Sequence, residues 1–509
     1  MARQRSNLKK RLFGFVFSSN MLNMLHNHRN KGTFGKENTM TIQFYLNGEL
    51  RREDAVSPTT TVLDYLRVSA GKTGTKEGCA EGDCGACTIV VVRKNEDDEP
   101  LYEAVNSCLL ILPQLDGANV VTVEGLARDS NFDPVQTAMV ESDGTQCGFC
   151  TPGFIMALFA LRQGNEKITD GTIHDALAGN LCRCTGYSPI VQAAHHACQD
   201  ATKDLYGELI TLIPGEGYKH NHQMFFAPQD LSQLAEIRTD YPKAMMLAGG
   251  TDLGLLFSKD RDPLEAIIYT SSVAELGEIE ETKDYLEIGA AVTYTRILPY
   301  FERLYPSFAT LITRIGSRQI RNVGTLGGNI GTASPIGDTL PCLIALNATL
   351  TLYSKGSHRE LPLEDFFIAY RKTDLKPGEF IKSIRIPKLK DEQKFRTYKI
   401  SKRYDQDISS VIGAYRIEID GLKVKEIRIA FGGMAEIPKR AVACEGAFLD
   451  KEWVEDTALK AGLEVATDFK PLSDHRATKD YRLCVAANLF IRLYRDLTDA
   501  EDLMEVVAA

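Results

Sequence analysis

With 509 residues, the chain is long enough for three or four domains of about 100–200 residues each. Hydrophobic residues make up 44% and charged residues 25%, as in an ordinary globular protein. No apolar run approaches the roughly 18–20 residues of a membrane helix, and the net charge of −9 argues against a nucleic-acid partner. We therefore expect a cytoplasmic multidomain protein with neither a membrane nor a nucleic acid as partner.

Residues 1–39 form a basic segment. They contain eight Lys or Arg and one acid, Glu37, which gives a net charge of +7. The apolar patch at residues 12–17 is too short for a secretory signal, and no A-x-A cleavage site follows it. We predict a disordered extension, or translated sequence upstream of a natural start at Met40. A weak targeting peptide is the alternative.

Residues 40–125 are predicted to form a small β-rich domain. Residues 41–46 alternate between polar and apolar, Asn47-Gly48 is a hairpin turn signal before residues 49–52, and residues 88–92 are a β-branched run. Residues 61–69 between them fit a helix with one apolar side.

Residues 126–200 change to helical spacing. Pro152 can open a helix over residues 153–162, because a first helical turn does not use the N–H that proline lacks. A second helix is predicted over residues 169–181. In a third, Ser188 is expected at the N-cap and Pro189 at the first position.

The remaining sequence divides into three parts. Residues 201–222 lack periodicity and are predicted to be a linker. Residues 223–392 mix strands and helices, with glycine concentrated at 249–254 and 324–331. Residues 393–506 begin with strands, over 411–419 and 424–431, and end with helices over 452–469 and 480–497.

Eight of the 12 cysteines lie in two groups between residues 79 and 184. Grouped cysteines in a long chain with no secretion signal indicate a metal site rather than disulfides. The scattered Cys198, Cys342, Cys444 and Cys484 are expected to be buried and inert.

The first group has the spacing C-x4-C-x2-C at Cys79, Cys84 and Cys87, with Cys108 further on. This is the spacing of a plant-type 2Fe–2S centre, in which one tight loop supplies three of the four thiolates. Nearby glycines allow positive φ and bring N–H groups close to the sulfurs. Zinc, which more often takes two C-x2-C pairs, is the alternative.

The second group combines C-x2-C at Cys147 and Cys150 with C-x-C at Cys182 and Cys184. Together these cysteines supply four thiolates from the ends of two predicted helices. The helix opened by Pro152 offers partial positive charge to an anionic cluster. From spacing alone, a four-thiolate zinc site remains possible.

Two glycine-rich blocks follow, MMLAGGTDLG at 245–254 and GTLGGNIGTASPIGD at 324–338. Such loops expose N–H groups that can hold a pyrophosphate, and Asp338 could accept from a ribose or ribityl hydroxyl. Neither block is the dinucleotide fingerprint G-x-G-x-x-G. Tight turns in an α+β domain are the alternative interpretation.

Three segments taken together resemble the iron–sulfur half of the molybdenum hydroxylases, the family of xanthine dehydrogenase and aldehyde oxidase. They are residues 77–87, 146–153 (QCGFCTPG) and 182–187 (CRCTGY). The resemblance implies an α+β multidomain protein with a β-grasp 2Fe–2S ferredoxin domain and a four-helix 2Fe–2S domain. An α+β FAD-binding domain of the CO dehydrogenase flavoprotein (PCMH) type and a C-terminal α+β domain would follow. All eight cysteine positions match, which disfavours zinc.

The resemblance also implies which residues contact FAD. They are Met246, Ala248, Gly249, Gly250, Thr251, Leu253, Ile315, Thr325, Gly328, Asn329, Thr332, Ser334, Asp338, Ile381 and Lys399. A charged loop at residues 401–408 would lie near the flavin ring, with an ordinary solvated loop as the alternative. No catalytic acid or base is expected on this chain.

The layout is similar to the small subunit of two-subunit bacterial xanthine dehydrogenase. We therefore expect an electron-transfer subunit of an NAD-dependent xanthine dehydrogenase, partnered by a large molybdopterin-binding subunit in an α2β2 or larger assembly. Electrons from hypoxanthine and xanthine, oxidised to urate at the partner's molybdenum cofactor, would pass through two 2Fe–2S clusters to FAD and then NAD. The helical-domain cluster would lie nearer the molybdenum.

Two alternatives remain at this point. The partner could oxidise an aldehyde or another N-heterocycle, because the substrate pocket is expected on the other chain. The chain could also be a flavin-free iron–sulfur carrier.

Overall fold

Alternation of apolar and polar residues builds the first domain as a mixed five-stranded sheet in the order β2-β1-β5-β3-β4. Its strands are β1 (Ile42–Leu46), β2 (Glu49–Glu53), β3 (Thr88–Lys94), β4 (Pro100–Asn106) and β5 (Asn119–Val121). Asn47 and Gly48 both have positive φ, 54° and 86°, as the predicted hairpin turn requires. β1 and β5 are parallel, and the other pairs are antiparallel.

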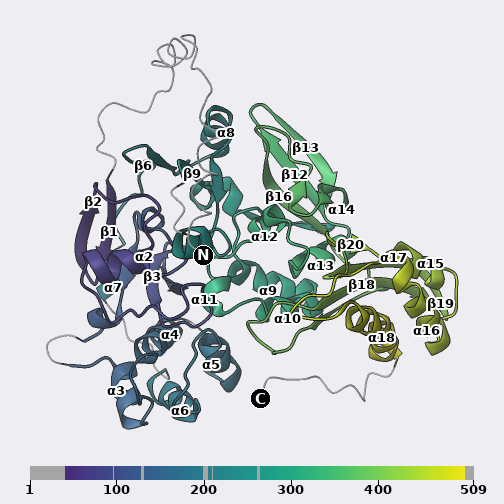
Figure 1. Ribbon diagram of the computed structural model, residues 1–509, viewed down its shortest axis with the longest axis horizontal. Coiled ribbons are helices and arrows are strands. Elements are labelled where there is room, and N and C mark those ends of the chain that lie inside the picture. The colour runs from purple at the N-terminus through teal and green to yellow at the C-terminus, as the bar shows by residue number, and fades with distance from the viewer. Residues whose placement is uncertain are drawn as a thin grey trace, which may run out of the picture. The chain divides into compact units, whose positions relative to one another are not determined.

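The predicted helix of this domain is present as α2 (Val62–Asp64), which continues as the π-helical turn η1 (Tyr65–Ser69). It buries Val62 and Leu66 in one core with Phe44 and Val91 of the sheet. A mixed sheet curled around one helical segment is the predicted β-grasp arrangement (Figure 1).

The structure is a computed structural model that describes residues 41–498 except 96, 128–130, 165, 199–204, 209 and 261–263. These residues belong to one compact unit that starts at Met40. The predicted basic extension, residues 1–39, lies outside the described residues, as does the end of the predicted C-terminal domain after residue 498.

Four helices form the second domain: α3 (Pro134–Glu141), α4 (Thr151–Gln163), α5 (Asp170–Leu177) and α6 (Ser188–Ala197). The prediction that the second of the three expected helices reaches residue 181 was wrong. α5 ends at Leu177, because the chain turns away to form the loop that carries Cys182 and Cys184. The N-cap of α6 is Tyr187 rather than Ser188, so this helix begins one residue earlier than predicted.

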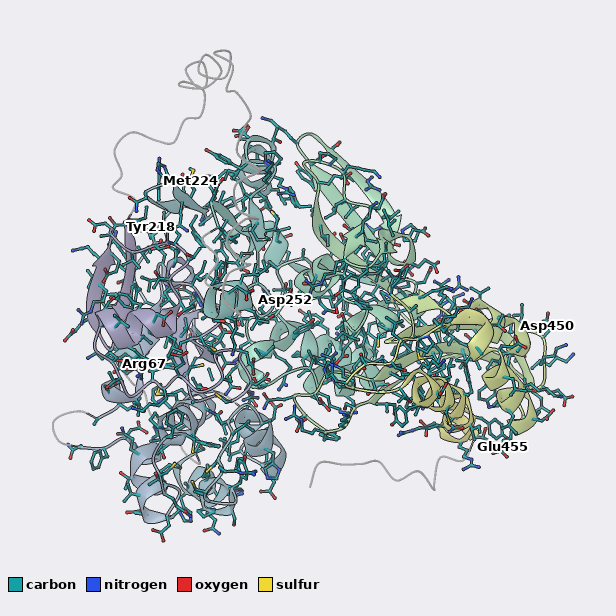
Figure 2. The ribbon with its side chains drawn as sticks, viewed as in Figure 1. Arg67, Tyr218, Met224, Asp252, Asp450 and Glu455 are labelled. Atoms are coloured by element: carbon teal, nitrogen blue, oxygen red, sulfur yellow. The ribbon has the colours of Figure 1, made fainter. Side chains whose placement is uncertain are left out.

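The predicted linker contains regular structure. It includes α7 (Leu205–Glu208) and β6 (Gly217–His220). The Tyr206 hydroxyl donates to the Gly125 carbonyl at 2.6 Å, and the Tyr218 hydroxyl (Figure 2) donates to the Val56 carbonyl at 2.7 Å. These contacts fasten the segment to the first domain.

Two sheets form the third domain. The first has the order β6-β7-β9-β8, in which β7 (Gln223–Phe226), β9 (Ala266–Tyr269) and β8 (Met245–Leu247) run parallel. The second is antiparallel in the order β10-β11-β16-β12-β13. Its strands are β10 (Ile279–Glu281), β11 (Tyr285–Gly289), β16 (Phe380–Pro387), β12 (Thr349–Ser354) and β13 (Ser357–Pro362).

Helices of the third domain connect and cover these sheets. They are α8 (Leu231–Asp240), α9 (Tyr294–Leu304), α10 (Pro306–Thr313), α11 (Arg318–Arg321), α12 (Leu326–Thr332), α13 (Thr339–Ala345) and α14 (Leu363–Phe366). A small hairpin, β14 (Phe367–Ala369) with β15 (Lys372–Thr373), follows α14. α12 lies within the second glycine-rich block, and Asp338 at the end of the block is the N-cap of α13.

The fourth domain is an antiparallel sheet covered by helices. The strands β17 (Gln393–Ile400), β18 (Val411–Asp420), β19 (Lys423–Gly432) and β20 (Lys439–Arg440) pair in chain order. The helices are α15 (Val442–Phe448), α16 (Glu455–Leu463), α17 (Val465–Asp468) and α18 (Lys479–Thr498). The helix predicted over 452–469 is therefore broken in two. Within the described residues, no helix is both long and apolar enough to cross a bilayer.

Candidate iron–sulfur and flavin sites

The first cysteine loop wraps its backbone around its own sulfur atoms. The N–H groups of Glu81 and Cys84 donate to Cys79 Sγ, each at 3.4 Å, and the Cys79 N–H donates to Cys84 Sγ at 3.3 Å. Gly82 and Gly85 have positive φ, 82° and 67°, which permits the tight path. A Cβ on Gly78 would lie 2.7 Å from Cys84 Sγ, so this close approach requires glycine.

The four sulfurs of this site are arranged in two pairs. Cys79 shares a side-chain hydrogen bond with Cys84, which lowers the pKa of Cys79 to about 5 and raises that of Cys84. Cys87 shares one with the buried Cys108, which lowers the pKa of Cys87 and raises that of Cys108. Two pairs of thiolates are the donor set that a two-iron cluster with four cysteine ligands needs.

The second cysteine site repeats this paired arrangement. Burial, followed by a side-chain hydrogen bond with Cys182, raises the pKa of Cys150 to about 12. Cys184 is hydrogen-bonded to Cys147, which raises the pKa of Cys184. Each pair joins one cysteine from the segment that leads into α4 to one from the loop after α5. This loop is the segment that interrupts the predicted second helix.

Within the described residues, no three or more His, Cys, Asp or Glu side chains are grouped closely enough to hold a metal ion. Both sites nevertheless provide four cysteines with backbone N–H groups directed at their sulfurs, which is the donor set of a two-iron cluster. The residues present fit a two-iron cluster at each site, with one pair for each iron.

The two cysteine loops contact each other directly. The Leu181 N–H donates to the Cys84 carbonyl at 3.0 Å, and Asn180 Nδ2 donates to the Gly85 carbonyl at 3.0 Å. A Cβ on Gly153 would lie 2.3 Å from the same Gly85 oxygen. A backbone hydrogen bond therefore links the residue before Cys182 to Cys84 of the first site.

The first cysteine loop also contacts the first glycine block. A Cβ on Gly254 would lie 2.5 Å from the carbonyl oxygen of Leu109, the residue after Cys108, and one on Gly250 would lie 3.2 Å from it. Gln114 Nε2 donates to the Ala248 carbonyl at 3.3 Å. The chain thus brings the second cysteine site, the first cysteine site and the glycine block into a continuous series of contacts.

The two glycine blocks pack against each other. A Cβ on Gly249 would lie 1.7 Å from the Val323 carbonyl oxygen, so only glycine fits there. Thr325 is the N-cap of α12, and its hydroxyl accepts from the Gly328 N–H at 2.9 Å. The sequence prediction that both blocks belong to one site is consistent with this geometry.

A buried ion pair lies beside the second block. Lys399 Nζ and Asp338 Oδ2 are 2.5 Å apart, and the Ser409 hydroxyl donates to Asp338 Oδ1 at 2.8 Å. The Thr339 hydroxyl donates to Asn329 Oδ1 at 2.6 Å. Each Asp338 oxygen keeps a lone pair that can accept from a ligand hydroxyl. Sequence reasoning missed Ser409, and no motif marks it.

The residues predicted to contact FAD are all buried or half-buried. Gly249, Gly250, Thr325, Ile381 and Lys399 are buried, and the rest are half-buried: Met246, Ala248, Thr251, Leu253, Ile315, Gly328, Asn329, Thr332, Ser334 and Asp338.

The charged loop at 401–408 is held by neighbouring elements. Arg314 lies over the Tyr404 ring at 4.5 Å and donates to the Tyr404 carbonyl at 3.1 Å. Gln406 Nε2 donates to the Ala178 carbonyl, close to the second cysteine site. The loop is therefore fixed between α10 and the helical domain.

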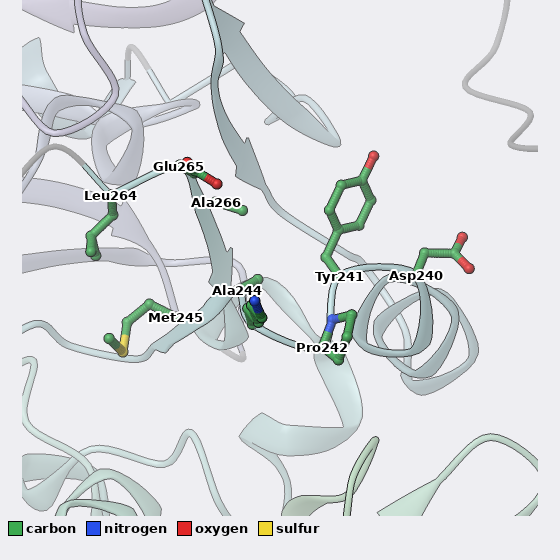
Figure 3. Close-up of a pocket in the computed structure, with 9 residues that line it drawn as sticks. Asp240, Tyr241, Pro242, Ala244, Met245, Leu264, Glu265 and Ala266 are labelled. Carbon is green, nitrogen blue, oxygen red and sulfur yellow. The ribbon is translucent and has the colours of Figure 1, made fainter. Parts of the chain in front are cut away.

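A pocket of about 410 Å³ opens at the amino end of β8, away from the glycine loop at its carboxyl end (Figure 3). Its lining is Asp240, Tyr241, Pro242, Lys243, Ala244, Met245, Leu264, Glu265 and Ala266, none of which was predicted to contact FAD. Parallel sheets bind ligands at the carboxyl ends of their strands, so this pocket is not the flavin site that the glycine loops indicate.

Of the scattered cysteines, Cys198, Cys342 and Cys444 are buried, as predicted. The prediction was wrong for Cys484, which is exposed. It lies on α18, whose buried side is formed by residues such as Ala486 and Phe490.

Comparison with known protein families assigns all four domains. Residues 44–112 match the 2Fe-2S iron-sulfur cluster binding domain, and residues 122–195 match the [2Fe-2S] binding domain. Residues 219–389 match the FAD binding domain in molybdopterin dehydrogenase. Residues 396–497 match the CO dehydrogenase flavoprotein C-terminal domain. The predicted fold class is confirmed.

Similar proteins include the xanthine dehydrogenase of Emericella nidulans, 33% identical over 90% of this chain and 38% of that protein. The chain thus spans well under half the length of this relative. Among solved structures, carbon monoxide dehydrogenase from Hydrogenophaga pseudoflava aligns with 53% of this chain and 96% of that chain, at TM-score 0.51 and 25% identity. Quinoline 2-oxidoreductase from Pseudomonas putida aligns with 55% of this chain and 99% of that chain, again at 0.51 and 25%.

Fold and domain matches together define an iron–sulfur flavoprotein of the oxidoreductase class, with two 2Fe–2S domains and an FAD-binding domain. More particularly, the chain is the electron-transfer region of a molybdenum hydroxylase-family protein. It is homologous to the N-terminal region of xanthine dehydrogenases and to the small-subunit family of molybdenum hydroxylases.

Proposed function

We propose that the chain is the electron-transfer part of an NAD-dependent xanthine dehydrogenase. When bound, its two 2Fe–2S clusters and FAD would supply electron transfer from a molybdenum centre on a large partner subunit to NAD, as hypoxanthine and xanthine are oxidised to urate. The observation that carries the proposal is the continuous series of contacts from the second cysteine site through the first to the glycine blocks.

The eight cysteines would hold the iron in the pairs that the structure forms. At the first site, one iron would take Cys79 with Cys84 and the other Cys87 with Cys108. At the second site, the pairs would be Cys150 with Cys182 and Cys147 with Cys184. The backbone N–H groups aimed at these sulfurs stabilise the negative charge of an anionic cluster.

FAD would be held by the paired glycine blocks. The N–H groups of the blocks would bind its pyrophosphate, and Asp338 would accept from a ribityl or ribose hydroxyl. Lys399 neutralises the Asp338 carboxylate and keeps it oriented. Because Gly250 and Gly254 contact Leu109, this chain's backbone holds the flavin site against the first cysteine site.

The exposure of the two cysteine sites supports an order of centres. Cys87 and Cys108 are buried, whereas Cys147 and Cys184 are exposed. Phe149, Leu181 and Tyr187 beside the second site are 48%, 48% and 40% exposed, although they are large and apolar. Exposed apolar residues of this kind favour a partner surface over this face, which supports the proposal that the second site lies nearer the molybdenum centre.

The direct test is to co-purify the chain with the products of the neighbouring genes and to assay hypoxanthine-dependent NAD reduction. The proposal predicts a complex with a molybdenum-containing subunit and turnover with hypoxanthine. A complex that turns over but ignores hypoxanthine and xanthine would contradict the substrate. A chain that binds no such subunit would contradict the role.

A second candidate is the same electron-transfer role with a different substrate. The likeness to carbon monoxide dehydrogenase and to quinoline 2-oxidoreductase favours it, because those proteins are named for other substrates. Screening the complex with an aldehyde and an N-heterocycle such as quinoline separates the two candidates.

A further inference from the structure

The loop between α5 and α6 directs three hydrogen-bond donors at one sulfur of the second site. The N–H groups of Cys184 and Thr185 donate to Cys182 Sγ at 3.4 and 3.5 Å. The Thr185 hydroxyl donates to the same sulfur at 3.2 Å. Two of these donors come with any tight cysteine loop, but the hydroxyl depends on the side chain at residue 185.

A second hydrogen bond fixes the direction of the Thr185 hydroxyl. The Tyr187 N–H donates to Thr185 Oγ1 at 3.2 Å, so the oxygen acts as acceptor there and its proton is free for Cys182 Sγ. The Cys182 N–H in turn donates to the Tyr187 hydroxyl oxygen at 3.0 Å. Cys182, Thr185 and Tyr187 form a closed ring of hydrogen bonds that includes Cys182 Sγ.

The backbone of Tyr187, which takes part in these hydrogen bonds, is itself strained. Its φ is 70° and its ψ −33°, in the region that favours glycine, and Gly186 before it also has a positive φ of 69°. The Tyr187 ring packs edge-on against Phe154 of α4, with centroids 6.3 Å apart. Strained residues persist where their surroundings over-determine them, and they cluster at functional sites.

We propose that Thr185 is a positioning residue that raises the reduction potential of the second cluster, and that Tyr187 holds it in place. The inference rests on the proposed function, because it needs a 2Fe–2S cluster at this site. Uptake of one electron adds one negative charge to the cluster, with no bond formed or broken and no proton transferred. A hydroxyl that donates to a ligand sulfur stabilises that added charge, and hydrogen bonds to the sulfurs are among the factors that set such potentials.

The test compares three threonine variants by redox titration with dithionite, followed by the EPR signals of the clusters. Thr185→Val keeps the shape but removes the hydroxyl, and Thr185→Ser keeps the hydroxyl. Thr151→Val is the matched control. Thr151 adjoins Cys150 as Thr185 adjoins Cys184, but its hydroxyl pairs with Thr145 at 2.6 Å instead of a sulfur.

We expect Thr185→Val to make the one-electron reduction of the second cluster about tenfold less favourable, which corresponds to roughly 59 mV lower potential. In Thr185→Ser and Thr151→Val, the potential of the second cluster should stay close to that of the unchanged protein. The potential of the first cluster should not shift in any variant. Tyr187→Phe keeps the backbone N–H that donates to Thr185 Oγ1, so it should shift the potential of the second cluster by much less than Thr185→Val does.

The outcomes separate the two proposals. If the unchanged protein shows no second 2Fe–2S signal, the proposed function fails. If both signals are present and Thr185→Val titrates at the unchanged potential, the inference about Thr185 is overturned. If Thr185→Val does not assemble the cluster, a further variant, Thr185→Ala, which also lacks the hydroxyl, decides: a lowered potential supports the inference, and an unchanged one contradicts it.

Discussion

Cys147 is the exposed cysteine of the C-x2-C pair, and its sulfur pairs with Cys184 across the second site. Replacing it with serine removes one of four thiolates without altering the first site or the glycine blocks. Cys147→Ser should abolish the EPR signal of one cluster and block purine-to-NAD turnover, while NADH still reduces FAD. Loss of flavin reduction by NADH in this variant would contradict the order of centres.

The ion pair between Asp338 and Lys399 gives a second prediction at the residue scale. The Lys399 side chain is 2% exposed, and removing its partner would leave a buried charge unpaired. Asp338→Asn should therefore destabilise the protein by about 3–5 kcal/mol and lower the FAD content per chain. Calorimetry and flavin release on heating measure the two effects.

Ser409→Ala is the matched control for that variant. It removes one hydrogen bond to Asp338 but leaves the ion pair intact. The expected cost is about 1 kcal/mol, with FAD retained. Equal effects of the two variants would show that the ion pair has no special role.

At the scale of elements, Asn180 links the loop after α5 to the first cysteine loop and to α11. Its amide nitrogen donates to the Gly85 carbonyl, and its oxygen accepts from Gln319 Nε2 at 2.8 Å. Asn180 and Gln319 are both buried, so their polar atoms have no water to replace a lost partner.

Asn180→Ala should lower the free energy of unfolding by about 2–3 kcal/mol, because it leaves buried groups unsatisfied. It should also weaken iron retention at both sites. Asn488→Ala, at an exposed position on α18, is the control and should change stability by less than about 0.5 kcal/mol. Denaturant unfolding and iron content measure the outcome, and an Asn180 variant that matches the control would refute the role.

The contact between the two glycine blocks gives a further prediction at this scale. A Cβ on Gly249 cannot fit against the Val323 carbonyl, so Gly249→Ala must push the blocks apart. The variant should lose FAD but keep its iron, as measured by absorbance and metal analysis. Gly446→Ala on α15 is the control, because a Cβ there meets nothing within 4 Å. Equal FAD binding by the two variants would contradict the proposal that the glycine blocks form the FAD site.

At the scale of the whole molecule, features formed by residues close together in the sequence could be predicted, and contacts between distant residues could not. The cysteine groups and the Asn47-Gly48 turn are local, so spacing indicated two four-cysteine sites and the first hairpin. The choice of iron over zinc at the second site needed the family resemblance as well. The helix predicted to residue 181 was too long, because the chain leaves α5 at Leu177 to form the loop that carries Cys182 and Cys184.

Contacts between distant parts of the chain could not be predicted from spacing. Gln319 meets Asn180 across 139 residues, and Ser409 meets Asp338 across 71. Neither pair belongs to a motif, because each exists only once the domains have packed. The two-and-two pairing of the cysteines likewise emerges only from the folded loops.

The central claim concerns the molecule as a whole, that eight cysteines gather two iron pairs. Its most direct test is metal, labile sulfide and EPR analysis of the purified chain. Two 2Fe–2S clusters require about four irons and about four sulfides per chain, with two distinct signals on reduction. One or two zinc ions in place of that iron, with no labile sulfide, would contradict the account.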